Sequence, residues 1–175
     1  MARRMILVAI GANLPGDDDR LPLDTCRWAA RRLAAMPAVH AVALSRWYSS
    51  DPVPPGPQPD YVNGVIRFDA SLDPVTLLGI LHDIEAETGR IRGAPNAART
   101  LDLDLLAVDD LVIDTATLVL PHPRLELRAF VLAPLCDVAP GWRHPRLGRT
   151  AAELLVALPD AGAAKPLPSA PAGPI

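Results

Sequence analysis

Two aspartates alternate with leucines in the segment 99–106, which reads RTLDLDLL. If this segment is a strand, its leucines at odd positions point to the core, and Asp102 and Asp104 project together from the opposite face. Their Cα atoms would then lie about 6.5–7 Å apart, so both carboxylates could ligate one cation or a close pair of cations. Oxygen ligands of this kind favour magnesium or manganese over zinc. The alternative is a half-buried strand with a solvated outer face, although aspartate is disfavoured in strands and like charges on one face repel.

Three arginines, Arg90, Arg92 and Arg99, accompany this segment. Metal ions neutralise and orient phosphate oxygens, and guanidinium groups bind further oxygens in pairs, so the combination suits a metal-bound polyphosphate. Surface ion pairs are the alternative interpretation of the arginines. Gly11 and Gly16 have the glycine spacing of a P-loop, but acidic residues follow where lysine and serine or threonine are needed. Phosphate recognition is therefore expected from side chains.

Tyr61 and Asn63 follow a proline-rich loop at 50–60. Two residues apart on a strand, they would share a face, and an aromatic ring beside an amide suits a flat heterocycle. A tyrosine packed on the sheet next to a turn asparagine is the alternative.

Three further side chains, His122, Arg128 and Phe130, form another candidate set near the C-terminal third of the chain. A histidine between two prolines, as here, also fits a purely structural role. His82 and Glu85 are three residues apart and would be neighbours on a helix, where an exposed polar face is the default expectation.

The elements that must position these residues follow from hydrophobic spacing and from capping residues. In chain order we expect a strand at 5–10, a helix at 21–36, strands at 39–49 and 62–69, a helix from Asp73 to a C-cap at Gly89, and a strand at 100–108. This order predicts an α+β, ferredoxin-like split βαβ core, that is, an antiparallel sheet with helices on one face. A C-terminal extension adds helices near 128–135 and from Thr150, which has capping-box spacing to Glu153.

The 175 residues are 50% apolar and 21% charged, which predicts one globular domain at 1–158. Residues 159–175 are rich in proline and alanine, and we expect a disordered tail there. A net charge of -3 and 4% aromatic residues argue against a nucleic-acid partner. The longest apolar run, 5–10, is far shorter than the roughly 20 residues that span a bilayer. Together with two isolated cysteines, these features predict a cytoplasmic monomer without a membrane partner.

The motifs resemble those of the hydroxymethyl-dihydropterin pyrophosphokinase family, which transfers pyrophosphate from ATP to a pterin alcohol. The matching segments, in chain order, are AIGANL, WYSSDPVPPGPQPDYVNG, IEAETGRIR, RTLDLDLL and LPHPRLELRAFVLAPL. Each segment alone is weak evidence, but RTLDLDLL together with QPDYVN and the later PH and RAF segments is specific. The resemblance also implies a ferredoxin-like core.

The resemblance implies a role for each candidate residue. Asp102 and Asp104 would ligate two Mg²⁺ ions that bridge ATP, the co-substrate, to the acceptor hydroxyl, and with Arg90 and Arg99 they would form the catalytic set. The implied ATP-binding residues are His82, Glu85, Arg92, His122 and Arg128. The implied pterin-binding residues are Tyr61 and Phe130 on the two faces of the ring, with Ser50, Val53 and Asn63 around its edge.

Four places depart from the family pattern. Residues 96–98 read Asn-Ala-Ala where a Trp-Gly-Pro run is usual, His82 replaces a glutamine, Val119 a threonine and Asp51 a proline. These changes concern adenine contacts and a loop more than the aspartates.

The expected activity is Mg²⁺-dependent transfer of pyrophosphate from ATP to 6-hydroxymethyl-7,8-dihydropterin with release of AMP, a step of folate biosynthesis. One rival is a metal-dependent nucleotidyltransferase, which would release pyrophosphate instead. Another is a non-catalytic ferredoxin-like module that binds a ligand or RNA, and a third is a degenerate enzyme that keeps the fold without the activity.

Overall fold

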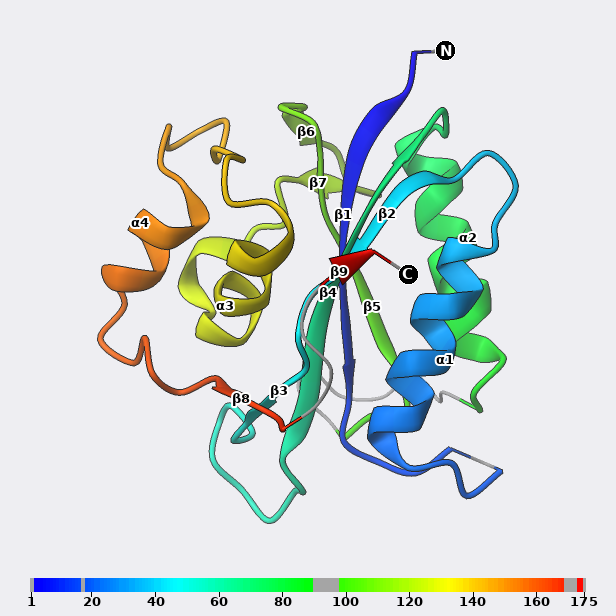
Figure 1. The fold of residues 1–175 in the computed structure, drawn as a ribbon, viewed down its shortest axis with the longest axis vertical. Helices are drawn as coiled ribbons and strands as arrows, with labels where there is room; N and C mark the ends of the chain where they lie inside the picture. Colours follow the sequence, from blue (N-terminus) through cyan, green and yellow to red (C-terminus); the bar gives the residue numbers. More distant parts are fainter. Residues whose placement is uncertain (1, 17, 90–97, 169–172, 175) are drawn as a thin grey trace.

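The computed structural model describes residues 2–16, 18–89, 98–168 and 173–174. Its main sheet has the strand order β5-β1-β4-β2-β9, with β3 pairing with both β4 and β8, and all of these pairings are antiparallel (Figure 1). The strands of this sheet are β1 (Arg4–Ala12), β2 (His40–Leu44), β3 (Tyr48–Ser50), β4 (Tyr61–Ala70), β5 (Asp102–Val108), β8 (Lys165–Pro166) and β9 (Gly173–Pro174). A small second sheet pairs β6 (Ile113–Asp114) with β7 (Val119–Leu120).

Helices cover both faces of the main sheet (Figure 1). On one face lie α1 (Pro22–Ala34) and α2 (Pro74–Ala86), and on the other lie α3 (Ala129–Val138), preceded by a short 3-10 turn at Leu125–Leu127, and α4 (Ala151–Val156). Alternate side chains of β1 therefore enter two different cores. Ile6 and Val8 pack under α1 and α2, whereas Leu7 packs under α3. This explains why the first strand is apolar without interruption.

The predicted helix signals are confirmed at three helices. Pro22 is the first residue of α1, where its missing N–H costs nothing. Asp73 caps α2 by accepting a hydrogen bond from the Thr76 N–H at 3.0 Å. At α4, Thr150 and Glu153 make both hydrogen bonds of the capping box.

The strand expected at 39–49 is divided into β2 and β3. The residues between them pack closely on β4: the Ser45 Oγ accepts a hydrogen bond from the Val65 N–H at 2.9 Å, and the Trp47 ring covers Gly64. A Cβ on Gly64 would lie 2.6 Å from the indole, so glycine is required there. Long-range packing, rather than local propensity, interrupts the strand.

Part of the segment expected to be disordered, 159–175, pairs with the sheet. Lys165 and Pro166 form β8 beside β3, and the Leu167 N–H donates to the Trp47 carbonyl at 2.8 Å. Ala164 is buried, and Leu167 packs against the core under α1 and α2. A strand at a sheet edge tolerates proline because its outer side needs no donor. No helix within the described ranges is long and apolar enough to cross a membrane.

Candidate active site

Asp102 and Asp104 lie on β5, on the sheet face opposite α1 and α2. Leu101, Leu103 and Leu105 are buried in the core under those two helices, as the alternation predicts. The side chain of Asp102 is 23% exposed and that of Asp104 is 33% exposed, so solvent and a ligand can reach both. The predicted pair of carboxylates on one face is confirmed.

Three of the predicted site residues, two arginines and a histidine, surround this pair. The Arg99 Nη1 lies 2.6 Å from Oδ1 of Asp102. The Oδ2 of Asp104 lies 3.8 Å from the Arg128 Nη1 and also 3.8 Å from the His122 Nε2. Residues 90–97, which include Arg90 and Arg92, lie outside the described ranges, so their predicted places at the triphosphate stay predictions.

Burial and neighbouring charge act together on these groups. Burial, and then the negative charge of Asp102, raises the pKa of Asp104. Burial also lowers the pKa of His122, an effect that the charge of Asp104 opposes. The pKa of Arg99 is raised: burial lowers it, but the nearby Asp102 carboxylate outweighs burial. Burial is thus the main reason that ionised Asp104 is costly in the metal-free site, and the charge of Asp102 adds to that cost.

The donor set fits Mg²⁺. Within the described ranges, no group of three or more His, Cys, Asp or Glu side chains is placed to hold a metal. Mg²⁺ does not require such a group, because proteins usually hold it through one or two carboxylates while substrate phosphates and water supply the remaining oxygens. Asp102 and Asp104 provide two carboxylates, and their mutual repulsion would fall when a divalent cation binds.

A row of three paired residues, Asp102, Gly11 and Asn63, crosses three neighbouring strands, and we call it the polar strip. Gly11 on β1 pairs with Asp102 on one side and with Asn63 of β4 on the other. Because glycine has no side chain, no side chain of β1 stands between the Asp102 carboxylate and the Asn63 amide at this position. A Cβ on Gly11 would lie 3.3 Å from the Asn63 Oδ1.

The predicted pterin-binding residues of β3 and β4 lie beside this strip. Ser50 pairs with Tyr61 in the sheet register, and Asn63 follows on the same face of β4. The Asn63 Nδ2 donates a hydrogen bond to the Ser50 Oγ at 2.8 Å, and both residues are buried. Val53 lies in the loop that follows β3 and is 66% exposed, so a ligand could reach it there.

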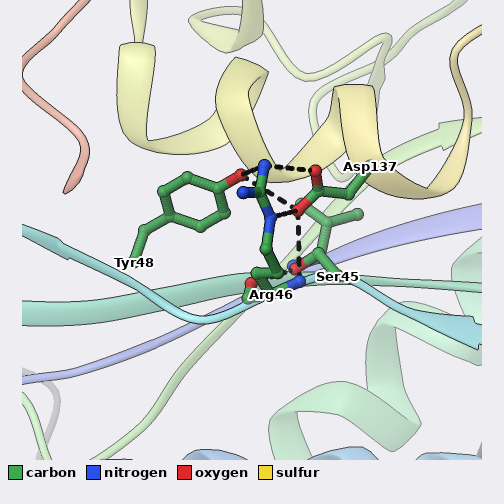
Figure 2. Close-up of polar contacts among 5 residues, drawn as sticks. Ser45, Arg46, Tyr48 and Asp137 are labelled. Atoms are coloured by element: carbon green, nitrogen blue, oxygen red, sulfur yellow. Dashed lines mark hydrogen bonds and ion pairs between the residues drawn. The ribbon is translucent and has the colours of Figure 1, made fainter. Parts of the chain in front are cut away.

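Helix α3 brings Arg128 and Phe130 to the same face. Arg128 directly precedes the helix, and its Cζ lies 5.5 Å from the centre of the Phe130 ring. Near the other end of α3, the carboxylate of Asp137 accepts hydrogen bonds from Arg46, with Nε at 3.1 Å and Nη2 at 2.9 Å, and from the Tyr48 hydroxyl at 2.9 Å (Figure 2). This cluster ties the helix to the β2–β3 connection.

Glu85 does not lie on an exposed polar face, so that default expectation is wrong for it. It is 3% exposed, and its Oε1 accepts a hydrogen bond from the Leu103 N–H at 2.7 Å. This N–H belongs to β5, an end strand of the sheet that pairs with β1, and the carboxylate satisfies it. His82 lies one turn earlier on α2 and is half-buried.

Sequence reasoning singled out neither Asn13 nor the Arg46–Tyr48–Asp137 cluster. Their partners are distant in the sequence: Asn13 contacts Arg99, and Arg46 contacts Asp137. Asn13 stands within the AIGANL segment, three residues after the end of the strand expected at 5–10, and that position was the available signal.

An antiparallel sheet that presents paired carboxylates, guanidinium groups and a polar strip on one face has the donor set of a metal-dependent phosphoryl-transfer enzyme. The family model described as 7,8-dihydro-6-hydroxymethylpterin-pyrophosphokinase (HPPK) matches residues 7–140. The chain belongs to this family.

Two relatives that match this chain along most of their own length carry the name of the same family. The 2-amino-4-hydroxy-6-hydroxymethyldihydropteridine pyrophosphokinase of Pseudomonas aeruginosa is 41% identical over 157 residues, covering 90% of this chain and 93% of that protein. The protein of the same name from Synechocystis is 42% identical over 133 residues, which cover 76% of this chain and 68% of the Synechocystis protein.

Solved structures share the fold. The Plasmodium falciparum HPPK-DHPS wild type with pteroate superposes with a TM-score of 0.64 at 13% identity, covering 87% of this chain. This chain spans 42% of that longer polypeptide. At such low identity the likeness supports the fold alone.

Proposed function

We propose that this chain transfers pyrophosphate from ATP to the hydroxymethyl group of 6-hydroxymethyl-7,8-dihydropterin, with release of AMP, in folate biosynthesis. One observation carries the proposal: Asp102 and Asp104 project from one face of β5 with Arg99, His122 and Arg128 around them, beside the polar strip that leads to Asn63. The family membership of the chain supports the same reaction.

We infer that Asp102 and Asp104 hold two Mg²⁺ ions. The projection of both carboxylates from one face of β5, and the exposure that both side chains retain, support this inference. Bound Mg²⁺ supplies charge neutralisation and orientation of phosphate oxygens.

Arginine and histidine side chains, together with Glu85, would bind and orient the nucleotide. Arg99 would hold the triphosphate next to Asp102, together with Arg90 and Arg92. Arg128 and His122 would act on the Asp104 side, and His82 and Glu85 complete the proposed nucleotide set. For Glu85 the support is indirect, because its hydrogen bond to Leu103 fixes the strand that carries both aspartates.

The pterin would lie on the other part of the face, between the rings of Tyr61 and Phe130. Asn63, Ser50 and Val53 would hydrogen-bond or line its edge. The acceptor oxygen then attacks the β-phosphorus, the bond from that phosphorus to the oxygen of the α-phosphate breaks, AMP leaves with that oxygen, and the hydroxyl proton passes to water. Positioning of the two substrates and neutralisation of charge account for most of the rate.

We also infer a ferredoxin-like split βαβ core. The strand order β5-β1-β4-β2, with α1 connecting β1 to β2 and α2 connecting β4 to β5, supports this inference. A single domain at 1–158, a cytoplasmic location, a monomeric state and the lack of a nucleic-acid or membrane partner stay predictions from the sequence.

The test is chromatography of the nucleotides left after purified protein is incubated with ATP, Mg²⁺ and the reduced hydroxymethyl pterin. The proposal predicts AMP that forms only when the pterin is present. Release of pyrophosphate with retention of the nucleotidyl group would instead identify a nucleotidyltransferase. Unchanged ATP would identify a binding module or a degenerate enzyme.

A further inference from the structure

Asn13 is a buried amide, 1% exposed, that directly follows β1. Its Oδ1 accepts a hydrogen bond from the Arg99 N–H at 2.8 Å. Its Nδ2 donates to the Pro59 carbonyl at 3.0 Å and to the Gln58 Oε1 at 3.3 Å. Its backbone N–H donates to the Arg99 carbonyl at 3.0 Å. The side chain thus joins two segments that lie far from it, and far from each other, in the sequence.

The partners fix the orientation of this amide. The Arg99 N–H can only donate and the Pro59 carbonyl can only accept, so the oxygen of Asn13 must face Arg99 and the nitrogen must face the proline-rich loop. Both hydrogens of Nδ2 are used. The two ends of the amide therefore have separate tasks, and a substitution can remove one of them while keeping the other.

The two segments serve different substrates in the proposed reaction. Arg99 forms the ion pair with Asp102 on the phosphate side. Pro59 comes two residues before Tyr61, which pairs with Ser50 on the pterin side. A shift of the proline-rich loop would move the start of β4, and with it the side chains proposed to contact the pterin.

We propose that Asn13 is a positioning residue that fixes the proline-rich loop, and through it the pterin subsite, relative to the phosphate-binding Arg99. This inference rests on the proposed function. Asn13 acts through Pro59, Gln58 and Arg99.

Asn13→Asp separates the two tasks with almost no change of shape. A carboxylate can still accept from the Arg99 N–H, but it has no hydrogen for the Pro59 carbonyl and turns an oxygen toward that acceptor, while the Gln58 amide would have to rotate to donate. Since an unsatisfied buried acceptor is costly, we expect the KM for the pterin to rise about tenfold or more, while the KM for ATP changes less than about twofold. An equal rise in both constants, or an unchanged pterin constant, overturns the inference.

Gln58→Ala is the second variant. It tests the proposed positioning role of Asn13 if Asn13→Asp does not give a folded protein by circular dichroism. It removes one acceptor of Nδ2 and leaves Asn13 and Arg99 intact, so the pterin KM is expected to rise about twofold to threefold with the ATP KM unchanged. Parallel changes in both constants, or no change, contradict the inference. Wild-type protein is assayed alongside, because failure to form pterin-dependent AMP there refutes the proposed function itself.

Discussion

The Oδ2 of Asp104 lies 3.8 Å from the Nη1 of Arg128, so the strand with the paired carboxylates directly faces the start of α3. The Nη1 of Arg99 lies 2.6 Å from the Oδ1 of Asp102 in the same way. Each carboxylate therefore has its own guanidinium partner. A phosphate group that enters with a divalent cation would find carboxylates for the cation and arginines for its own oxygens already adjacent.

Asp104→Asn is expected to stabilise the metal-free protein at neutral pH. Burial and the charge of Asp102 raise the pKa of Asp104, so the folded state binds this proton more tightly than the unfolded state does. Stability from this group is therefore greatest at low pH and falls as pH rises through the folded pKa. With chelator present, the variant should melt at a higher temperature than wild type at pH 7.

The same difference should shrink as the pH is lowered toward the unfolded pKa of an aspartate, about 3.9. Asp110→Asn, at an exposed position, controls for the loss of one negative charge. A variant that melts below wild type at pH 7 would show that the ion pair with Arg128 outweighs burial.

Glu85→Ala is expected to lower the free energy of unfolding by about 1–3 kcal/mol, because it leaves the buried Leu103 N–H without its acceptor. Glu85→Gln keeps an oxygen at the same place and should lose less. Urea denaturation of both variants measures the difference. Equal losses would mean that the charge of Glu85, rather than its hydrogen bond to β5, is what matters.

Tyr48→Phe tests the cluster that holds α3. The Tyr48 hydroxyl donates to Asp137 at 2.9 Å and accepts from the Arg46 Nη2 at 2.8 Å. Burial, and then the hydrogen bond to Asp137, raises the pKa of Tyr48 to about 12, although Arg46 acts in the opposite direction. Its removal should cost about 1 kcal/mol in urea denaturation, since Arg46 still satisfies Asp137. In a double-mutant cycle with Asp137→Ala, a coupling above about 0.5 kcal/mol is expected, and strictly additive losses would argue against a direct interaction.

The features that sequence predicts well here are local. The alternation around Asp102 and Asp104 assigns each side chain to a face, because the period of a strand is two residues. The caps at Asp73 and Thr150 involve residues only three positions apart. For these, the neighbours that decide the structure are visible in the sequence itself.

Other features depend on partners that are far away along the chain. Asn13 and Arg99 are separated by 86 positions, and Arg46 and Asp137 by 91. The break between β2 and β3 arises where Trp47 meets Gly64 on the next strand, and the pairing of β8 depends on β3. No local pattern encodes such contacts, and composition alone predicts disorder for a segment that a neighbouring strand can order.

The most direct test of the central claim is steady-state turnover of Asp102→Ala and Asp104→Ala, assayed for pterin-dependent AMP at saturating ATP and Mg²⁺. Both variants should remain folded by thermal denaturation and lose roughly a thousandfold or more in kcat, because each removes a carboxylate placed to hold the metal. Turnover close to that of wild type in both variants would contradict the assignment of these two aspartates to the reaction.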